Sequence, residues 1–276
     1  MNALLQRPTL SEHEFGRLRE LIRREAAIHL PAHMKQSVSC RLEQRLRRLA
    51  LRGFAEYFDY ISHNQNVAEL QRAVDLLTTH ETYFFREPEQ FDYLTRSLLP
   101  QLGSGSLRFW SAAASSGEEA YSIAMVLMAN LGAGNRWEVL GSDISAEVLE
   151  KAREGVYRHE RLELIPIPYL HRFCLRGVGR AAGSVQIDQT LRQRVRFCRM
   201  NLASLPAGLE PFDVIFLRNV LFYFDASTRQ RVLAGVVSRL KPGGWLLLGH
   251  AECLNAASFG LRRQCPGVYR QVGEAS

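Results

Sequence analysis

Short apolar runs alternate with helical patterns from about residue 107 onward, and this alternation constrains the fold more than any other feature of the chain. The runs, typical of buried parallel strands, are LRFWSAA (107–113), WEVLGSDI (137–144), VRFCRMNL (195–202), FDVIFLRN (212–219), WLLLGH (245–250) and VYRQV (268–272). Helices are predicted between them, over SIAMVLMANL (122–131), over 145–155 and before Pro242-Gly243-Gly244. The pattern predicts an α/β fold with a doubly wound, mostly parallel sheet, which binds ligands at the carboxyl ends of its strands.

The first part of the chain is predicted to be helical almost throughout. Ser11 followed by Glu14 is a capping-box pattern, and the helix that it opens is predicted to end at Pro31. Further helices are predicted over 35–51, 54–61 and 67–77. We therefore predict an all-α N-terminal domain at 1–77, a linker at 78–90 and an α/β domain at 91–276.

Residues 156–194 fit the alternation poorly, because they are far longer than the usual connection of about 4–6 residues. The stretch contains Pro166, Pro168 and turn-like glycines, and a strand is predicted over Ser184–Asp188. We interpret it as an inserted element with structure of its own.

The composition is that of a soluble globular protein, with 46% apolar and 23% charged residues. No apolar run approaches the length of a membrane span, and no signal peptide opens the chain, so no membrane insertion is expected. The scattered cysteines form no CxxC pair, so we expect free thiols and no metal. The net charge of +7 favours an acidic partner, which is a nucleic acid, an anionic membrane surface or an acidic protein.

A turn of small residues follows the first predicted strand, over Ser111–Gly117, and leads into the next helix at Glu118. Small residues let a ligand lie against the backbone, and Asp143 ends the second strand where a nucleotide-binding sheet places its ribose-binding acid. The two features indicate a nucleoside cofactor. Two other interpretations stay open: Glu118 stabilises a helix N-terminus, and Asp143 caps the following helix.

The string TTHETYFFRE (78–87) joins the helical part to the sheet part. Phe84 and Phe85 are predicted to bury against the sheet domain, and Arg86 is predicted to lie at the cleft between the domains. The alternative is a hydrophobic hinge with a solvated arginine.

Taken together, several motifs resemble the CheR-type chemotaxis-receptor glutamate methyltransferases. They are TTHETYFFRE, RFWSAAASSGEEAYSIAM, GSDIS, LEKAREGVY, NL, FDVIFLRNVLFYFD and LKPGGWLLLGHAE, and the resemblance extends from about residue 11 to 270. It implies a helical N-terminal domain, a Rossmann-like S-adenosylmethionine-dependent methyltransferase domain and a small inserted β-subdomain at about 156–194. It also implies S-adenosylmethionine as cofactor, S-adenosylhomocysteine as product, and cofactor contacts from both domains and the linker.

The family's functional residues carry over position by position. The implied cofactor contacts are His80, Thr82, Arg86, Glu118, Asp143, Asn201, Leu202, Arg218 and Asn219, and the implied catalytic residues are Arg86 and Tyr223. The chain departs from the family at His80, where asparagine is usual, and at Ala120, where proline is common. We assign no role to His250 and Glu252.

The implied acceptor is a glutamate carboxylate, which is already ionised at neutral pH, because its reference pKa is about 4.3. No general base is needed, so the enzyme's task is positioning and desolvation. Arg86 is suited to hold a carboxylate, but whether it holds the cofactor's or the substrate's stays open. Tyr223 either donates a hydrogen bond or shapes the methyl pocket.

Partner contacts are predicted in two places. Arg41, Arg45, Arg48 and Arg52 recur at helical spacing on one stripe, which either docks on the glutamate-rich cytoplasmic domain of a receptor or is a solvated face. The inserted segment resembles family members whose β-subdomain binds a peptide at the receptor's C-terminus, although a plain linker hairpin is the alternative. The expected location is the cytoplasm, with recruitment to membrane receptor arrays.

Two rival functions agree with parts of the sequence. A nucleic-acid methyltransferase agrees with the basic charge, but no NPPY-like motif or motif-embedded cysteine nucleophile is present, so no nucleic-acid partner is expected. A non-catalytic cofactor-binding adaptor is disfavoured, because Arg86, Asp143, Arg218 and Tyr223 are all present.

Overall fold

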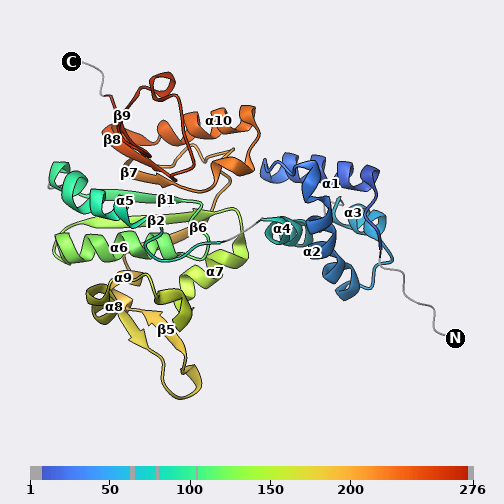
Figure 1. The fold of residues 1–276 in the computed structure, drawn as a ribbon, viewed down its shortest axis with the longest axis horizontal. Coiled ribbons are helices and arrows are strands. Elements are labelled where there is room, and N and C mark those ends of the chain that lie inside the picture. Colours follow the sequence, from blue (N-terminus) through green and yellow to red (C-terminus); the bar gives the residue numbers. More distant parts are fainter. Residues whose placement is uncertain (1–7, 63–65, 79–80, 104, 273–276) are drawn as a thin grey trace. The chain divides into compact units, whose positions relative to one another are not determined.

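The computed structural model describes residues 8–62, 66–78, 81–103 and 105–272 (Figure 1). The chain divides into two compact units, Met1–Thr79 with Tyr223–Asp225 and His80–Phe222 with Ala226–Ser276.

The first unit is all-helical in its described residues. Its helices are α1 (Glu12–Ala26), α2 (Lys35–Arg48), α3 (Phe54–Ser62) and α4 (Val67–Leu77), with a 3₁₀ turn at Ala32–Met34. The capping box is confirmed: the Glu14 amide donates to Ser11 Oγ at 3.2 Å, and the Ser11 amide donates to Glu14 Oε2 at 2.8 Å. Apolar faces of the helices form a core that includes the fully buried Leu18, Leu42 and Tyr57.

Two predicted helix ends in this unit are wrong. Helix α1 ends at Ala26, well before Pro31, because Ala27 adopts a left-handed conformation (φ 60°) that closes the helix. Helix α2 ends at Arg48 rather than at residue 51.

In the second unit, seven strands of the described residues form one sheet in the order β6-β2-β1-β7-β8-β10-β9 (Figure 1). They are β1 (Leu107–Ala112), β2 (Trp137–Asp143), β6 (Val195–Arg199), β7 (Phe212–Leu217), β8 (Leu240–Leu248), β9 (Leu261–Cys265) and β10 (Val268–Gln271). Strands β6, β2, β1, β7 and β8 pair in parallel, and β10 runs antiparallel to β8 and β9. The predicted α/β fold with a mostly parallel sheet is therefore confirmed.

Helices and turns connect these strands. The helices are α5 (Pro88–Tyr93), α6 (Glu118–Leu131), α7 (Ala146–Glu154), α8 (Ile167–Phe173), α9 (Gln189–Arg192) and α10 (Ala226–Val237). Short turns occupy Leu94–Leu98 (π), Leu99–Gln101, His159–Leu162, Gly179–Ala181, Leu221–Tyr223 and Ala256–Phe259. Helix α6 is buried on almost every side, as Tyr121, Ile123 and Leu127 show. The helix predicted before Pro242 ends earlier, at Val237, and Pro242-Gly243-Gly244 lies inside β8, beside a shift in its pairing with β7.

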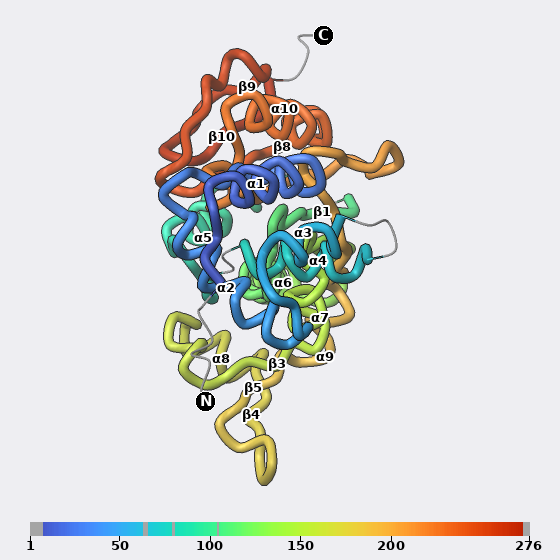
Figure 2. The backbone as a smooth tube through the Cα atoms, turned by 90° about the vertical axis from the view of Figure 1, so that its right-hand side faces the viewer, coloured from blue at the N-terminus to red at the C-terminus, as the bar shows by residue number. Residues whose placement is uncertain are grey.

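The inserted segment contains a small antiparallel sheet of its own. Its strands are β3 (Val156–Arg158), β4 (Cys174–Arg176) and β5 (Ser184–Ile187), with β5 in the centre. Tyr157, Val185 and Ile187 are buried in the same core cluster as the large sheet, so the segment is packed onto the α/β unit. The connection from β4 to β5 extends away from the large sheet in two perpendicular views (Figures 1 and 2).

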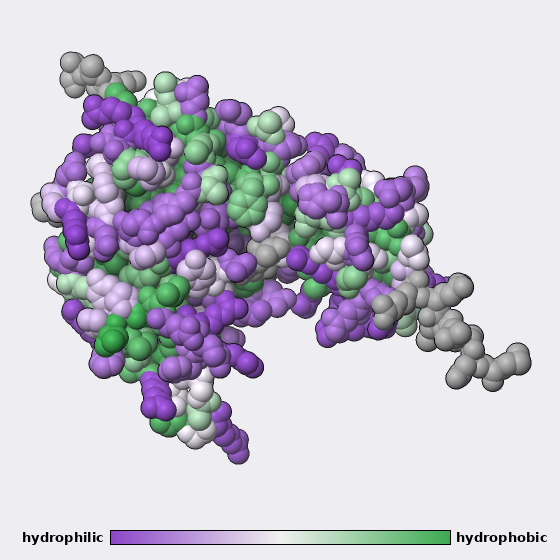
Figure 3. Space-filling model, viewed as in Figure 1, coloured by the Kyte–Doolittle hydropathy of each residue, from purple (hydrophilic) through white to green (hydrophobic). Residues whose placement is uncertain are grey.

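The surface of the inserted segment mixes apolar and polar residues. Ile167 is 68% exposed and Val178 is 80% exposed. Figure 3 shows hydrophobic surface over the α8 region, bordered by hydrophilic residues. None of the helices that the structure describes is long and apolar enough to cross a membrane.

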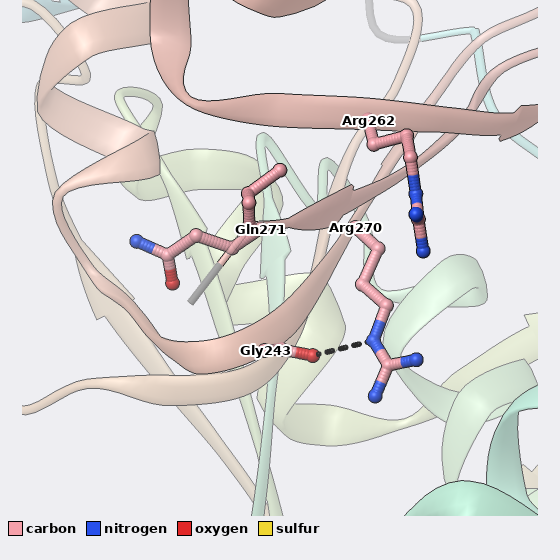
Figure 4. A pocket seen from close by; sticks show the side chains of 5 residues that line it. Gly243, Arg262, Arg270 and Gln271 are labelled. Carbon is pink, nitrogen blue, oxygen red and sulfur yellow. Dashed lines mark hydrogen bonds between the residues drawn. The ribbon is translucent and has the colours of Figure 1, made fainter. Parts of the chain in front are cut away.

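A pocket of about 220 Å³ lies beside the first half of β8, lined by Gly243, Arg262, Arg270 and Gln271 (Figure 4). Arg270 Nε donates to the carbonyl of Gly243 at 3.3 Å. Ligand sites in parallel sheets lie at the carboxyl ends of the strands, so this pocket is not the candidate active site.

Candidate active site

The turn after β1 has an unusual backbone. Ala113 (φ 69°) and Ser115 (φ 50°) both adopt left-handed conformations, and Gly117 follows at φ 96°. A Cβ on Gly117 would lie 2.9 Å from Cβ of Ala152, so the turn requires glycine there. Left-handed non-glycine residues cost about 1–3 kcal/mol each and gather at functional sites. The turn at the end of β1 thus combines left-handed backbone with small side chains.

Asp143 lies at the end of β2 and is only 7% exposed. Its Oδ2 accepts from the amide of Ser115 at 2.9 Å, and its Oδ1 accepts from the amide of Ser145 at 3.0 Å. The cap of helix α7 is Ser145, whose Oγ accepts from Val148 N, so the interpretation of Asp143 as the cap is wrong. Asp143 instead connects the turn after β1 to the turn after β2.

Glu118 opens helix α6 with its side chain almost fully buried. Ser116 Oγ donates to Glu118 Oε2 at 2.7 Å, and Arg161 Nη1 lies 3.4 Å from Oε1. Burial raises the pKa of the Glu118 carboxyl above its usual range. Arg161 also donates to the carbonyl of Thr82 at 3.0 Å. This arginine of the inserted segment therefore joins the linker to Glu118, and nothing in its local sequence marks it.

The linker packs on the α/β unit as predicted. Phe84 meets Tyr157 edge-on with ring centroids 4.9 Å apart, and Phe85 stacks on Tyr169 at 5.4 Å. Arg86 Nη1 donates to the carbonyl of Glu81 at 3.0 Å, and its guanidinium lies over the ring of Tyr83. His80 lies outside the described residues.

Arg218, directly after β7, forms a buried ionic network with two glutamates that the sequence analysis did not single out. Its side chain is 1% exposed, and its two terminal nitrogens each lie 2.9 Å from a carboxylate oxygen, Nη1 from Glu119 and Nη2 from Glu87. Nη2 also donates to the carbonyl of Arg86 at 2.5 Å. Burial alone would raise the pKa of Glu87, but the adjacent Arg218 charge holds it below its usual range. Burial raises the pKa of Glu119. Arg218 thus holds the linker against the sheet.

Asn201 and Leu202 follow β6. Asn201 Oδ1 accepts from the amide of Ala203 at 2.9 Å, and Leu202 is buried. The amide of the preceding residue, Met200, donates to the carbonyl of Asp143 at 2.9 Å, which places this turn beside the end of β2.

Asn219 also has a left-handed backbone (φ 56°). Its amide donates to Glu252 Oε2 at 2.8 Å, and its Nδ2 lies 3.4 Å from Glu87 Oε1. Glu252, to which the sequence analysis gave no role, is therefore part of the same edge. Tyr223 groups with the first unit and is not placed relative to these residues.

The four arginines of the predicted stripe differ in their surroundings. Arg45 Nε donates to Glu69 Oε1 at 2.7 Å, and Nη2 binds the other oxygen, so this guanidinium is held inside the helical unit. Arg41 donates to the carbonyls of Leu76 and Thr78, both at 3.3 Å. Arg52 lies beyond the end of α2. Arg48 is the exposed member of the set on the helix itself.

The parallel sheet with helices between its strands gives the second unit a Rossmann-like α/β fold. Comparison with known families makes this specific: residues 80–265 match the CheR methyltransferase, SAM binding domain, and residues 13–78 match the CheR methyltransferase, all-alpha domain. The chain therefore belongs to the CheR methyltransferase family, with an S-adenosylmethionine-binding methyltransferase domain.

Similar proteins cover nearly the same span. The chain is 44% identical to the chemotaxis protein methyltransferase of Escherichia coli K12, over 90% of this chain and 87% of that protein. It is 43% identical to the protein of the same name from Salmonella typhimurium LT2, over 95% and 91%. Chemotaxis protein methyltransferase 2 of Pseudomonas aeruginosa PAO1 is 41% identical, over 94% and 93%.

Proposed function

We propose that this protein transfers the methyl group of S-adenosylmethionine to glutamate side chains in the cytoplasmic domains of chemotaxis receptors, forming glutamate methyl esters in sensory adaptation. Membership of the CheR family and the names of its relatives support the class of reaction and the signalling role. The observation that carries the proposal is the gathering of Asp143, Arg218 and Asn219 at one edge of the sheet, in a chain 44% identical to a chemotaxis methyltransferase.

The residues at this edge fit the cofactor. Asp143 would accept the ribose hydroxyls, because a carboxylate can accept several hydrogen bonds at once. The small residues after β1 allow a nucleoside to approach the backbone, and Leu202 offers an apolar side chain to adenine. The proposed set is completed by Thr82, Arg86, Glu118, Asn201, Arg218 and Asn219, and His80 stays a prediction. When bound, S-adenosylmethionine supplies an electrophilic methyl group on a positively charged sulfur.

The acceptor's chemistry matches what these side chains can do. A glutamate carboxylate is ionised at neutral pH, so the site has to orient it and strip its water rather than deprotonate it. We assign Arg86 to hold a carboxylate, since a planar guanidinium binds one in a fixed geometry. Tyr223 is proposed to donate a hydrogen bond or to shape the space around the methyl group.

Receptor binding is assigned to two surfaces. On the first unit, the exposed Arg48 and Arg52 are the members of the arginine set suited to an acidic helix, because Arg41 and Arg45 are bound within the unit. On the inserted segment, strands β3 and β4 each pair on one side only among the described residues. A receptor C-terminal peptide would add there as a further strand and recruit this cytoplasmic enzyme to receptor arrays.

Methyl-labelled cofactor mixed with receptor-bearing membranes tests the proposal. The expected product is base-labile label on the receptor, released as methanol, because a carboxyl methyl ester hydrolyses in base. Base-stable label on the receptor would show another acceptor and sink the proposal, and so would no label at all.

A further inference from the structure

The carboxylate of Glu252 is surrounded by backbone amides. Among the described residues, four backbone N–H groups donate to it: Asn219 at 2.8 Å and Gly249 at 3.0 Å to Oε2, and Val220 at 2.8 Å and Leu221 at 2.7 Å to Oε1. The residue is 7% exposed. We call these five residues the Glu252 clamp.

The clamp satisfies amides that have no partner in the sheet. The chain leaves β7 at Leu217, so the amides of the next turn need another acceptor. The two carboxylate oxygens of Glu252 accept from all three of them, at Asn219, Val220 and Leu221. The clamp therefore fixes the path of residues 219–221 independently of their own side chains.

The clamp also explains two backbone details. Asn219 has a left-handed backbone (φ 56°), which asparagine adopts more readily than most L-residues, and the bonds from its own amide and that of Val220 to Glu252 hold it there. Gly249 must be glycine, because a Cβ there would lie 2.7 Å from Asn219 Nδ2 and 3.0 Å from Glu252 Oε2.

A second carboxylate holds the same two strand ends. Glu87 Oε1 lies 3.4 Å from Asn219 Nδ2, and the amide of His250 lies 3.2 Å from Glu87 Oε2. Glu87 is itself bound to Arg218. Glu252 therefore binds the backbone of Asn219, and Glu87 binds its side chain. Together they fix the orientation of the Asn219 side chain.

We propose that Glu252 is a positioning residue for methyl transfer, whose carboxylate holds residues 219–221 in the conformation that the reaction requires. The inference rests on the proposed function, because that function assigns Arg218 and Asn219 to the cofactor site. Glu252 itself touches neither substrate nor cofactor in this assignment. Its effect reaches the reaction through Asn219.

The substitution Glu252→Gln tests the proposal at nearly constant volume. The NH₂ group of glutamine replaces one carboxylate oxygen. Because it donates and cannot accept, it faces two backbone N–H groups that lose their acceptor. Gly249→Ala disturbs the same clamp from the other strand. The matched control is Glu138→Gln on β2, a carboxylate that binds Arg108 Nε at 2.7 Å outside the clamp.

Three measurements are made on each full-length variant: amide hydrogen exchange, equilibrium binding of S-adenosylhomocysteine, and methyl transfer at saturating cofactor and receptor. For Glu252→Gln and Gly249→Ala we expect about tenfold or faster exchange in peptides covering 217–222 and 247–253, with unchanged exchange in β1 and β2. Turnover should fall by about 10²-fold, as for a misplaced catalytic segment. Product affinity should fall less than turnover, since Asn219 is the only proposed cofactor contact in the clamp, and Asp143 and Leu202 would hold the nucleoside from other strands. Glu138→Gln should behave as wild type.

Two results would overturn the proposal. Normal turnover despite faster exchange at 217–222 would show that the reaction does not depend on the clamp. Faster exchange throughout the sheet, with equal losses in product binding and turnover, would reduce Glu252 to a residue of general stability. The proposed function is tested separately, on the wild-type protein. If that protein forms no base-labile ester, glutamate methylation is refuted whatever the variants do.

Discussion

Nη1 of Arg218 lies 2.9 Å from Oε2 of Glu119, although ninety-nine residues separate them in the sequence. Arg218 also binds Glu87 and the carbonyl of Arg86, so one buried guanidinium joins the linker, the start of α6 and the end of β7. Three segments of the candidate site in the second unit are thereby held together by one side chain.

Replacing Arg218 with leucine should destabilise the protein strongly. The change leaves two largely buried carboxylates without their cation, and breaking a buried ion pair in this way costs about 3–5 kcal/mol. Urea unfolding followed by circular dichroism measures the loss. The control is Lys151→Leu, which removes an exposed pair with Glu147 and should cost no more than about 1 kcal/mol. Equal midpoints for both variants would contradict the buried network.

Glu118→Gln should stabilise the protein at neutral pH while weakening cofactor binding. Burial raises the folded-state pKa of Glu118, so the ionised carboxylate costs stability above that pKa, and the cost disappears below the unfolded-state pKa. The gain in Tm of the variant over wild type should therefore grow as pH rises through this interval. Thermal unfolding of both proteins at a series of pH values checks this prediction. A difference in Tm that does not vary with pH would refute the raised pKa of Glu118.

Asp143→Asn should weaken binding of S-adenosylhomocysteine by about 10–100-fold, which corresponds to roughly 1–3 kcal/mol for a buried acceptor replaced by a donor. The amide also opposes one of the backbone N–H groups, of Ser115 or Ser145, that the carboxylate now accepts. Isothermal titration calorimetry measures the affinity. Glu147→Gln, on the exposed face of α7, is the control and should bind normally. Unchanged affinity in Asp143→Asn would remove Asp143 from the site.

Arg86→Ala should remove most methyl transfer, by about 10²-fold or more, because a charged hydrogen-bond donor at a reacting site contributes that much. The fold should survive, since the Arg86 guanidinium makes only a hydrogen bond to Glu81 and a contact with Tyr83 among the described residues. Initial rates with receptor membranes measure the loss of methyl transfer, and far-ultraviolet circular dichroism shows whether the variant is folded. Near-normal methylation by a folded variant would defeat the assignment.

Arg45→Glu and Arg48→Glu should fail in different ways. Arg45 is held between the two oxygens of Glu69, so its reversal places two carboxylates together and should unfold the helical unit at lower temperature. Arg48 is exposed, so its reversal should leave Tm unchanged and raise the KM for receptor. Thermal unfolding and receptor titration separate the two effects. Equal loss of stability in both variants would exclude Arg48 as a docking residue.

Local sequence predicted most of the elements, because their signals are short-range. The capping box at Ser11, the strands 107–112 and 212–217 and the buried helix after Gly117 follow from periodicity and caps. Strand β9 was missed, because its residues LRRQC bury only Leu261 and show no alternation. The ends of α1 and α2 were misplaced, since left-handed backbone at Ala27 (φ 60°) and Ala50 (φ 54°), rather than proline or glycine, follows those helices.

The candidate site also contains residues that the sequence predicted and residues that it did not. Asp143 and the small-residue turn were predictable, because parallel strands bring their carboxyl ends to one edge of a sheet. Glu87, Glu119, Arg161 and Glu252 were not, since each acts through partners far away in the chain. A charged residue also looks alike in sequence whether it is solvated or buried, which is why Arg45 was grouped with the exposed arginines.

The sequence by itself therefore determined the classes of element, the sheet and the chemical family, all of which depend on neighbouring residues and motif order. Only the tertiary structure decided which charges are sequestered. Arg45 is held by Glu69, Arg218 is enclosed by two carboxylates, and Glu252 gathers amides from two strand ends. The physical reason is desolvation: burial makes each partner indispensable, and burial is a property of the packed chain rather than of any local segment.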